Sequence, residues 1–138
     1  MASFTGGCAC GAVRYTCSGA PKLSLNCHCR DCQRLSGSAY LAAVIVDRTM
    51  FHFTQGIPTY YAVTAANGMT KRQGFCARCG APVVVMLDER PHIIAIAVGS
   101  LDDPEMYRPL ADMWVASAQP WDYMDPAVLK YPHAYHRP

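Results

Sequence analysis

The sequence predicts a mostly-β fold in one domain spanning residues 1–138, because short apolar runs alternate with turn residues along most of the chain. Long stretches with helical periodicity are lacking. A chain of 138 residues can build one hydrophobic core but not two independent ones. Hydrophobic side chains make up 51% of the residues and charged ones only 16%, which excludes an intrinsically disordered chain.

The expected strands are rich in β-branched and aromatic residues and are bounded by Gly, Pro, Asn and Asp. They cover residues 12–17, 39–46, 50–53, 59–63, 70–75, 82–87, 92–98 and 112–116. The turn signals between them are residues 55–58, Asn67-Gly68 and residues 88–91. Short helical turns are expected over residues 30–35 and 103–107. Residues 119–138 are rich in Pro and aromatics and are expected to wrap the domain as irregular chain.

Charge and hydropathy exclude several classes of partner. Twelve basic and ten acidic side chains give a net charge of +2, too weak to attract nucleic acid or an anionic membrane by electrostatics alone. No apolar run has the length of a membrane span, and the N-terminal residues lack the basic and apolar regions of a secretory signal. A cytoplasmic protein without a membrane partner is therefore expected.

Eight cysteines are the most informative feature of the composition. In a reducing compartment, cysteines clustered at short spacings bind metal more often than they form disulfides. All except Cys17 fall into three tight groups. These groups are Cys8 and Cys10; Cys27, Cys29 and Cys32; and Cys76 and Cys79. Zinc is the favoured ion, with two ions per chain expected.

The first and last groups together supply four thiolates, the number that a structural zinc site requires. On extended chain, Cys8 and Cys10 would place both sulfur atoms on one face. Cys76 and Cys79 form a metal-binding turn, in which Gly80 supplies an unusual backbone angle. We therefore predict one closed site made by Cys8, Cys10, Cys76 and Cys79.

The middle group offers three thiolates and leaves a fourth position for another ligand, as in many catalytic zinc sites. A site built from Cys27, Cys29 and Cys32 suits a soft ligand such as a substrate thiolate. Carbon–sulfur bond chemistry is the hypothesis that follows. Alternatively, Cys17 or His28 closes this site and both zinc ions are structural. His28 is expected to point away from the metal, and Cys17 to be a buried apolar residue.

Three segments resemble the GFA family, the glutathione-dependent formaldehyde-activating enzyme and centromere protein V type domains. They are GGCACGAVRY (residues 6–15), CHCRDCQRLSG (residues 27–37) and GFCARCG (residues 74–80), within core motifs of about residues 4–116. The late aromatic residues Trp114 and Trp121 also match. The resemblance implies a β-tent fold with a structural zinc at Cys8, Cys10, Cys76 and Cys79 and a catalytic zinc at Cys27, Cys29 and Cys32. It also implies condensation of glutathione with formaldehyde.

The expected function is thus a carbon–sulfur lyase-like enzyme acting on an adduct of a thiol such as glutathione, with the catalytic zinc site partly empty in the absence of substrate. Gln33 and Arg34 are candidate substrate-binding residues. Other basic residues near the cysteine motifs could also bind a substrate carboxylate, namely Arg30, Lys71, Arg72 and Arg78. For each of these, a structural or surface role is the alternative. Trp114 and Trp121 are expected in the core. The alternative function is a non-catalytic, zinc-stabilised module that binds protein or nucleic acid, although the low net charge argues against nucleic acid.

Overall fold

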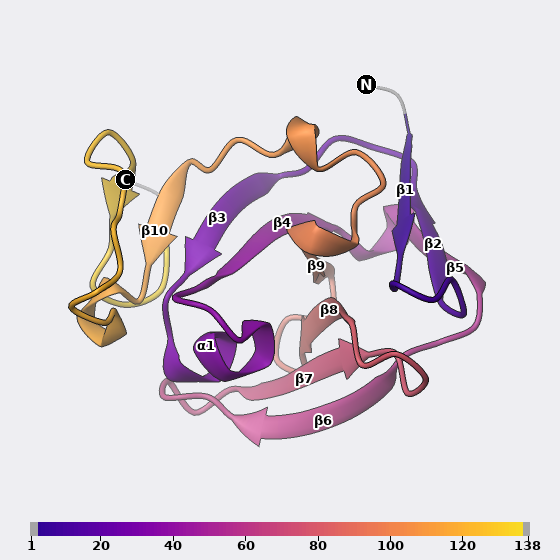
Figure 1. The fold of residues 1–138 in the computed structure, drawn as a ribbon, viewed down its shortest axis with the longest axis horizontal. Coiled ribbons are helices and arrows are strands. Elements are labelled where there is room, and N and C mark those ends of the chain that lie inside the picture. The colour runs from indigo at the N-terminus through magenta and orange to yellow at the C-terminus, as the bar shows by residue number, and fades with distance from the viewer. Residues whose placement is uncertain (1–2, 137–138) are drawn as a thin grey trace.

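The protein, described by a computed structural model over residues 3–136, is built from two β-sheets (Figure 1). The smaller sheet has the strand order β1-β2-β5, and its neighbours are antiparallel. Its strands are β1 (Phe4–Gly7), β2 (Arg14–Cys17) and β5 (Phe51–Gln55). In Figure 1 this sheet stands at one end of the molecule, opposite β10.

The larger sheet has eight strands in the order β11-β10-β3-β4-β9-β8-β7-β6. Its pairings are antiparallel, except that β10 runs parallel to both β3 and β11. The strands are β3 (Leu23–Cys27), β4 (Leu41–Asp47), β6 (Thr59–Thr64), β7 (Thr70–Phe75), β8 (Pro82–Leu87), β9 (Ile93–Ala97), β10 (Ala111–Met113) and β11 (Leu129–Lys130).

Helical structure is confined to short segments. The α-helix α1 (Arg30–Ser36) connects β3 to β4 and ends at Gly37, whose φ of +68° favours glycine. Single 3₁₀ turns occur at η1 (Arg48–Met50), η2 (Val98–Ser100), η3 (Pro104–Met106) and η4 (Val115–Ser117). In the described part of the chain, no helix combines the length and apolar character needed to cross a membrane.

The two faces of the larger sheet pack differently. On β4, Val44 and Val46 are fully buried in the core that joins this sheet to the smaller one, together with Tyr15 and Phe51. Residues of the other parity on β4, such as Ala43, face a second cluster that contains the middle group of cysteines. The second face therefore carries the candidate site.

The prediction of a mostly-β fold is confirmed, and the strands expected over residues 70–75 and 82–87 have the bounds of β7 and β8. Three strands were not expected: β1, which contains two glycines, and the short β3 and β11. The strand expected over residues 112–116 ends at Met113, because Trp114 adopts a left-handed φ of +59° and a 3₁₀ turn follows. Residues 1–2 and 137–138 of the predicted domain and tail lie outside the described residues.

Candidate metal sites and the adjoining pocket

Cys8 and Cys10 lie in the turn between β1 and β2, at one end of the smaller sheet. They are not on extended chain, so the expectation of a two-residue strand repeat was wrong. The turn itself brings the sulfur atoms together, since Gly11 has a φ of +80° and its amide donates to the Cys8 carbonyl at 3.4 Å. The two Sγ atoms are 3.7 Å apart.

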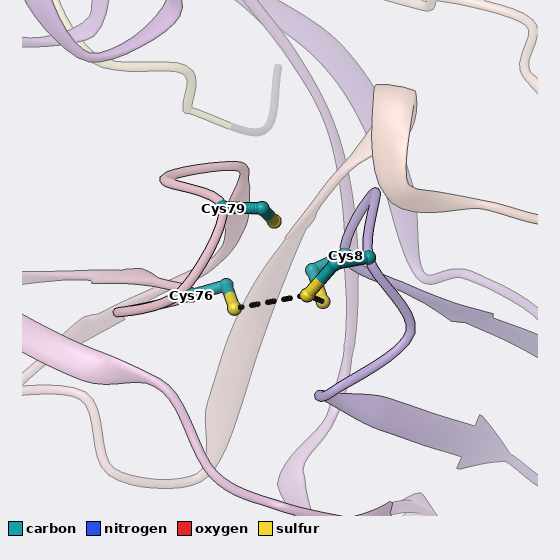
Figure 2. Close-up of side chains that lie close together, drawn as sticks. Cys8, Cys76 and Cys79 are labelled. Atoms are coloured by element: carbon teal, nitrogen blue, oxygen red, sulfur yellow. Dashed lines mark hydrogen bonds between the residues drawn. The ribbon is translucent and has the colours of Figure 1, made fainter.

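Cys76 and Cys79 lie in the turn between β7 and β8 of the larger sheet. As expected, Gly80 follows with a φ of +77°, and its amide donates to the Cys76 carbonyl at 2.7 Å. The Cys76 sulfur also accepts from the amide of Arg78 at 3.4 Å. Figure 2 shows Cys8, Cys76 and Cys79 turning their sulfur atoms towards one another across the gap between the two turns.

The four sulfur atoms fit a tetrahedral metal ion. All lie within 4.8 Å of one another, and Cys10 Sγ is 3.8 Å from Cys76 Sγ. A tetrahedral site with metal–sulfur distances of about 2.3 Å requires sulfur–sulfur distances of about 3.8 Å. Backbone hydrogen bonds at Ala81 and Cys10 lower the pKa of Cys79 to about 6, which favours the thiolate that a metal needs. This cluster, the four-cysteine cluster, can hold a metal ion and would join the two sheets.

The middle group forms a second cluster, the three-cysteine cluster, within one short segment. Cys27 ends β3, Cys29 is the N-cap of α1, and Cys32 lies in the first turn of that helix. Their ligand atoms lie within 4.8 Å of one another, and all three residues are buried. This donor set, three soft thiols without a fourth cysteine, fits a metal ion with one further position.

Two kinds of contact favour negative charge at Cys29. Hydrogen bonds from the thiols of Cys27 and Cys32 lower the pKa of Cys29 to about 2, whereas contacts among the three thiols raise the pKa of Cys27 to about 12 and also raise that of Cys32. Lys71 on β7 is 8% exposed, and its Nζ lies 3.4 Å from Cys29 Sγ and 3.6 Å from Asp31. Burial lowers the pKa of Lys71, but the three cysteines outweigh it and the net effect is a raised value, so the side chain is a cation.

Neither Cys17 nor His28 joins the three-cysteine cluster. Cys17 is fully buried in the core between the sheets, as expected of an apolar residue. His28 points away from the cluster, also as expected. Its Nε2 lies 3.0 Å from Asp112 and its Nδ1 2.7 Å from Asp122. This buried histidine is therefore held between two carboxyl groups, one at each ring nitrogen.

This arrangement fixes the loop that carries the cysteines. Burial raises the pKa of Asp112, but hydrogen bonds from Lys130, His28 and Asn26 outweigh that effect and hold it below its ordinary value. The histidine amide also donates to the carbonyl of Met113 at 3.0 Å. His28 thus ties the metal-binding loop to β10 and to the chain that follows it.

The candidate substrate-binding residues Gln33 and Arg34 occupy different environments. Gln33 is buried, and its Nε2 donates to the carbonyls of His28 at 2.7 Å and Ser117 at 3.0 Å. Its Oε1 accepts from Arg30 and from Gln119 at 3.1 Å. Arg34 is exposed and lies outside the lining of the pocket described below. Gln33 therefore stabilises the loop in this structure, and substrate contact by either residue stays a prediction.

A pocket of about 500 Å³ adjoins the three-cysteine cluster on the second face of the larger sheet. Its lining combines the three cysteines and Lys71 with apolar side chains of β3, β4, β8 and β9. Trp114 and Tyr135 from the C-terminal segment also line it. A concave site of this size that holds titratable groups is where a ligand is expected to bind.

Several of these positions could not be assigned from sequence. Lys71 carried no signal beyond its proximity to a cysteine motif, because its burial depends on where β7 lies relative to α1. Trp114 lines the pocket and is only partly buried, whereas the core position expected for Trp121 is wrong, since that side chain is 69% exposed. Asp112 and Asp122 act through His28, 84 and 94 residues earlier in the chain.

Comparison with known proteins gives a family and a fold. The family model described as "Glutathione-dependent formaldehyde-activating enzyme" matches residues 3–117. No curated protein matches the chain. Among solved structures, the crystal structure of a Rhodobacter sphaeroides protein is similar, with a TM-score of 0.58 and 16% identity, over 92% of this chain and 98% of that one. At this identity the likeness concerns the fold alone.

Proposed function

The chain belongs to the GFA family, and from that premise we propose that it is a zinc-dependent, carbon–sulfur lyase-like enzyme acting on adducts of a thiol and a carbonyl compound. One observation carries the proposal: the three-cysteine cluster forms part of a pocket wall, whereas the four-cysteine cluster has its own complete set of ligands. A ligand in the pocket can therefore approach the cluster that lacks a fourth sulfur.

Two zinc ions per chain are the proposed cofactors. Cys8, Cys10, Cys76 and Cys79 would hold the structural ion, and Cys27, Cys29 and Cys32 the catalytic one. When bound by three thiolates, zinc supplies an open position for a soft ligand and favours the thiolate form of a substrate thiol. Gln33 and Arg34 remain candidates for substrate contact, with the polar atoms of Gln33 already bonded within the protein.

The reaction proposed is the addition of a thiol to a carbonyl carbon, or its reverse. During the addition reaction, a carbon–sulfur bond forms, the carbonyl π electrons move to oxygen, and that oxygen takes the proton that the thiol has lost. In the reverse direction the hydroxyl proton leaves, the carbonyl re-forms and the carbon–sulfur bond breaks. No oxidant or reductant is needed, because the electrons stay within the two reactants.

Lys71 is the residue best placed to support this step. Three thiolates and a divalent ion carry one net negative charge, and a substrate thiolate adds a second. The Lys71 ammonium, buried at 3.4 Å from Cys29 Sγ, offsets part of that charge. It also lines the pocket, where negative charge develops on the carbonyl oxygen during addition.

The description of the family names glutathione and formaldehyde, so these are the first substrates to test. A compartment that keeps thiols reduced, such as the cytoplasm, suits a site that needs three reduced cysteines. None of the eight cysteines forms a disulfide in the described structure.

The test compares Cys29→Ser with Cys17→Ala, a change of a cysteine that belongs to neither cluster. Exchange between formaldehyde and its glutathione adduct is followed by ¹³C NMR, together with zinc per chain and thermal unfolding. We expect the wild type and Cys17→Ala to accelerate exchange with about two zinc ions bound. We expect Cys29→Ser to stay folded, retain about one zinc ion and lose the acceleration.

Two results would contradict the proposal. One is a fully zinc-loaded wild type that accelerates the exchange of no thiol adduct. The other is a Cys29→Ser protein that keeps the wild-type rate. Either would favour the alternative function, a non-catalytic module stabilised by zinc.

A further inference from the structure

The pocket beside the three-cysteine cluster is apolar over most of its floor. The larger sheet supplies this floor from one face, with Leu23 and Leu25 on β3, Ile45 on β4, Val85 on β8 and Ile93 on β9. Leu23, Ile45 and Ile93 are only partly buried. Partly exposed aliphatic side chains gathered in a concavity indicate a binding site for an apolar group.

The strand register explains why the face is hollow. Leu23 pairs with Ile45, Ile45 with Ala95 and Ala95 with Val85, so these four side chains form one row across the sheet. In the next row Leu25 pairs with Ala43, which in turn pairs with Ala97. Alanines thus occupy the centre of the face and larger aliphatic residues surround them. The small side chains of Ala43 and Ala95 therefore deepen the pocket at its floor.

Charged groups concentrate at its edges. Lys71 and Asp31 pair at 3.6 Å beside the cysteines, and Arg30 also lies at that end of the lining. The exposed side chains of Thr64, Asn67 and Arg90 line another part of its edge, outside the apolar floor. The apolar floor extends away from the three-cysteine cluster along β3, β4 and β9. A ligand with its sulfur at the cysteines would therefore place the rest of its structure against hydrocarbon.

We propose that the pocket selects a thiol adduct with an apolar organic body, a hydrocarbon chain or an aromatic ring, in preference to the polar tripeptide glutathione. This inference rests on the proposed function and specifies its substrate class. Glutathione would bring two carboxylates and two peptide groups onto a floor with few partners for them, and each unpaired group would lose its hydration. An alkyl chain has no hydrogen bonds with water to lose, and its transfer from water to this floor is favourable.

The expected effect grows with chain length. Each methylene buried should tighten binding about fourfold until the floor is covered. A pocket of about 500 Å³ is large enough for a ligand well beyond the size of a one-carbon adduct. Hexanethiol should therefore bind far more tightly than ethanethiol, and more tightly than glutathione.

The test uses zinc-loaded protein and titration calorimetry with ethanethiol, butanethiol, hexanethiol and glutathione, alongside the alcohols of equal chain length. The rise in affinity with length tests the apolar pocket, and the gain of each thiol over its alcohol tests the proposed function. Length dependence without a thiol gain would refute the function and leave the pocket's apolar preference standing. A thiol gain without length dependence, or tighter binding of glutathione, would overturn the inference and leave the function standing.

Two variants locate the effect. Ala95→Leu fills the centre of the floor and should abolish most of the gain from butanethiol to hexanethiol without changing zinc per chain. Its matched control is Ala62→Leu on β6, an exposed alanine outside the pocket lining, which should behave as wild type. If Ala95→Leu does not fold, Ile93→Gln serves instead and should weaken hexanethiol binding at least tenfold. Unchanged hexanethiol binding in a folded floor variant would also overturn the inference.

Discussion

Replacing Lys71 by methionine should weaken metal binding at the three-cysteine cluster and leave the four-cysteine cluster unaffected. Methionine keeps the apolar stem and removes the ammonium, whose Nζ lies 3.4 Å from Cys29 Sγ. At an effective dielectric constant of about 20, two unit charges at that distance attract by about 5 kcal/mol. Desolvation of the buried lysine offsets part of this attraction.

The net loss should match that of a hydrogen bond to a charged group, about 1.5–3 kcal/mol. This corresponds to a fall in metal affinity of about 10- to 100-fold. Titration with a chromophoric zinc chelator resolves the weaker and the tighter ion in the same experiment. Lys22→Met is the matched control, because Lys22 pairs with Asp47 at the same 3.6 Å as Lys71 with Asp31 but is exposed and lies outside both clusters and the pocket lining.

The result that would refute this reasoning is an unchanged affinity of the weaker site in a correctly folded Lys71→Met protein. An equal loss at both sites would also refute it, because it would indicate a general effect on the fold. In either case the contact between Lys71 and Cys29 would not contribute to metal binding, and its supporting role in the proposed reaction would fall with it.

Three further predictions concern stability. Cys76→Ser should remove the ion that joins the two sheets and lower the free energy of unfolding by about 4 kcal/mol, the value for releasing a cross-link between residues 66 positions apart. Urea unfolding combined with zinc analysis measures this loss. Unchanged stability after the zinc is lost would contradict the prediction. His28→Ala should lower the free energy of unfolding by about 3–5 kcal/mol in the same assay, because the buried side chains of Asp112 and Asp122 lose the histidine that both contact. A loss below about 1 kcal/mol would show that the contacts of His28 with these two residues do not stabilise the fold. Arg14 and Thr5 hold the pKa of Asp102 at about 2, below its unfolded value, so its contribution is present above about pH 4 and is lost as the pH falls towards 2. Asp102→Asn should therefore show a shallower loss of stability over that range than wild type, and parallel curves would contradict the prediction.

The sequence was sufficient for features determined by neighbouring residues. The strand β8 follows from its run of valines and β7 from the Asn67-Gly68 turn before it, and both clusters follow from cysteine spacing alone. Features that depend on pairing between residues distant in sequence could not be predicted from the sequence. The strand β1 carries two glycines and forms because β2 and an isolated bridge to Leu101 complete its hydrogen bonds.

The position of Lys71 illustrates the same limit at the site. Its burial beside Cys29 requires β7 and α1, 42 residues apart in sequence at the contact, to meet on one face of the sheet. The hollow floor is equally non-local, because alanines at positions 43 and 95 become neighbours of a single cavity only through the order β3-β4-β9-β8. Spacing predicts which residues share a metal, but topology decides what surrounds them.

The two clusters also differ in how the fold supports them. The four-cysteine cluster is assembled from turns in different sheets, so its metal and the packing of those sheets stabilise each other. The three-cysteine cluster lies within six residues, and its loop is fixed by protein contacts through His28 to Asp112 and Asp122. Loss of metal there should therefore leave the fold intact. The C-terminal segment that anchors this loop also lines the pocket with Trp114 and Tyr135, so the same segment positions the cysteines and shapes the space beside them.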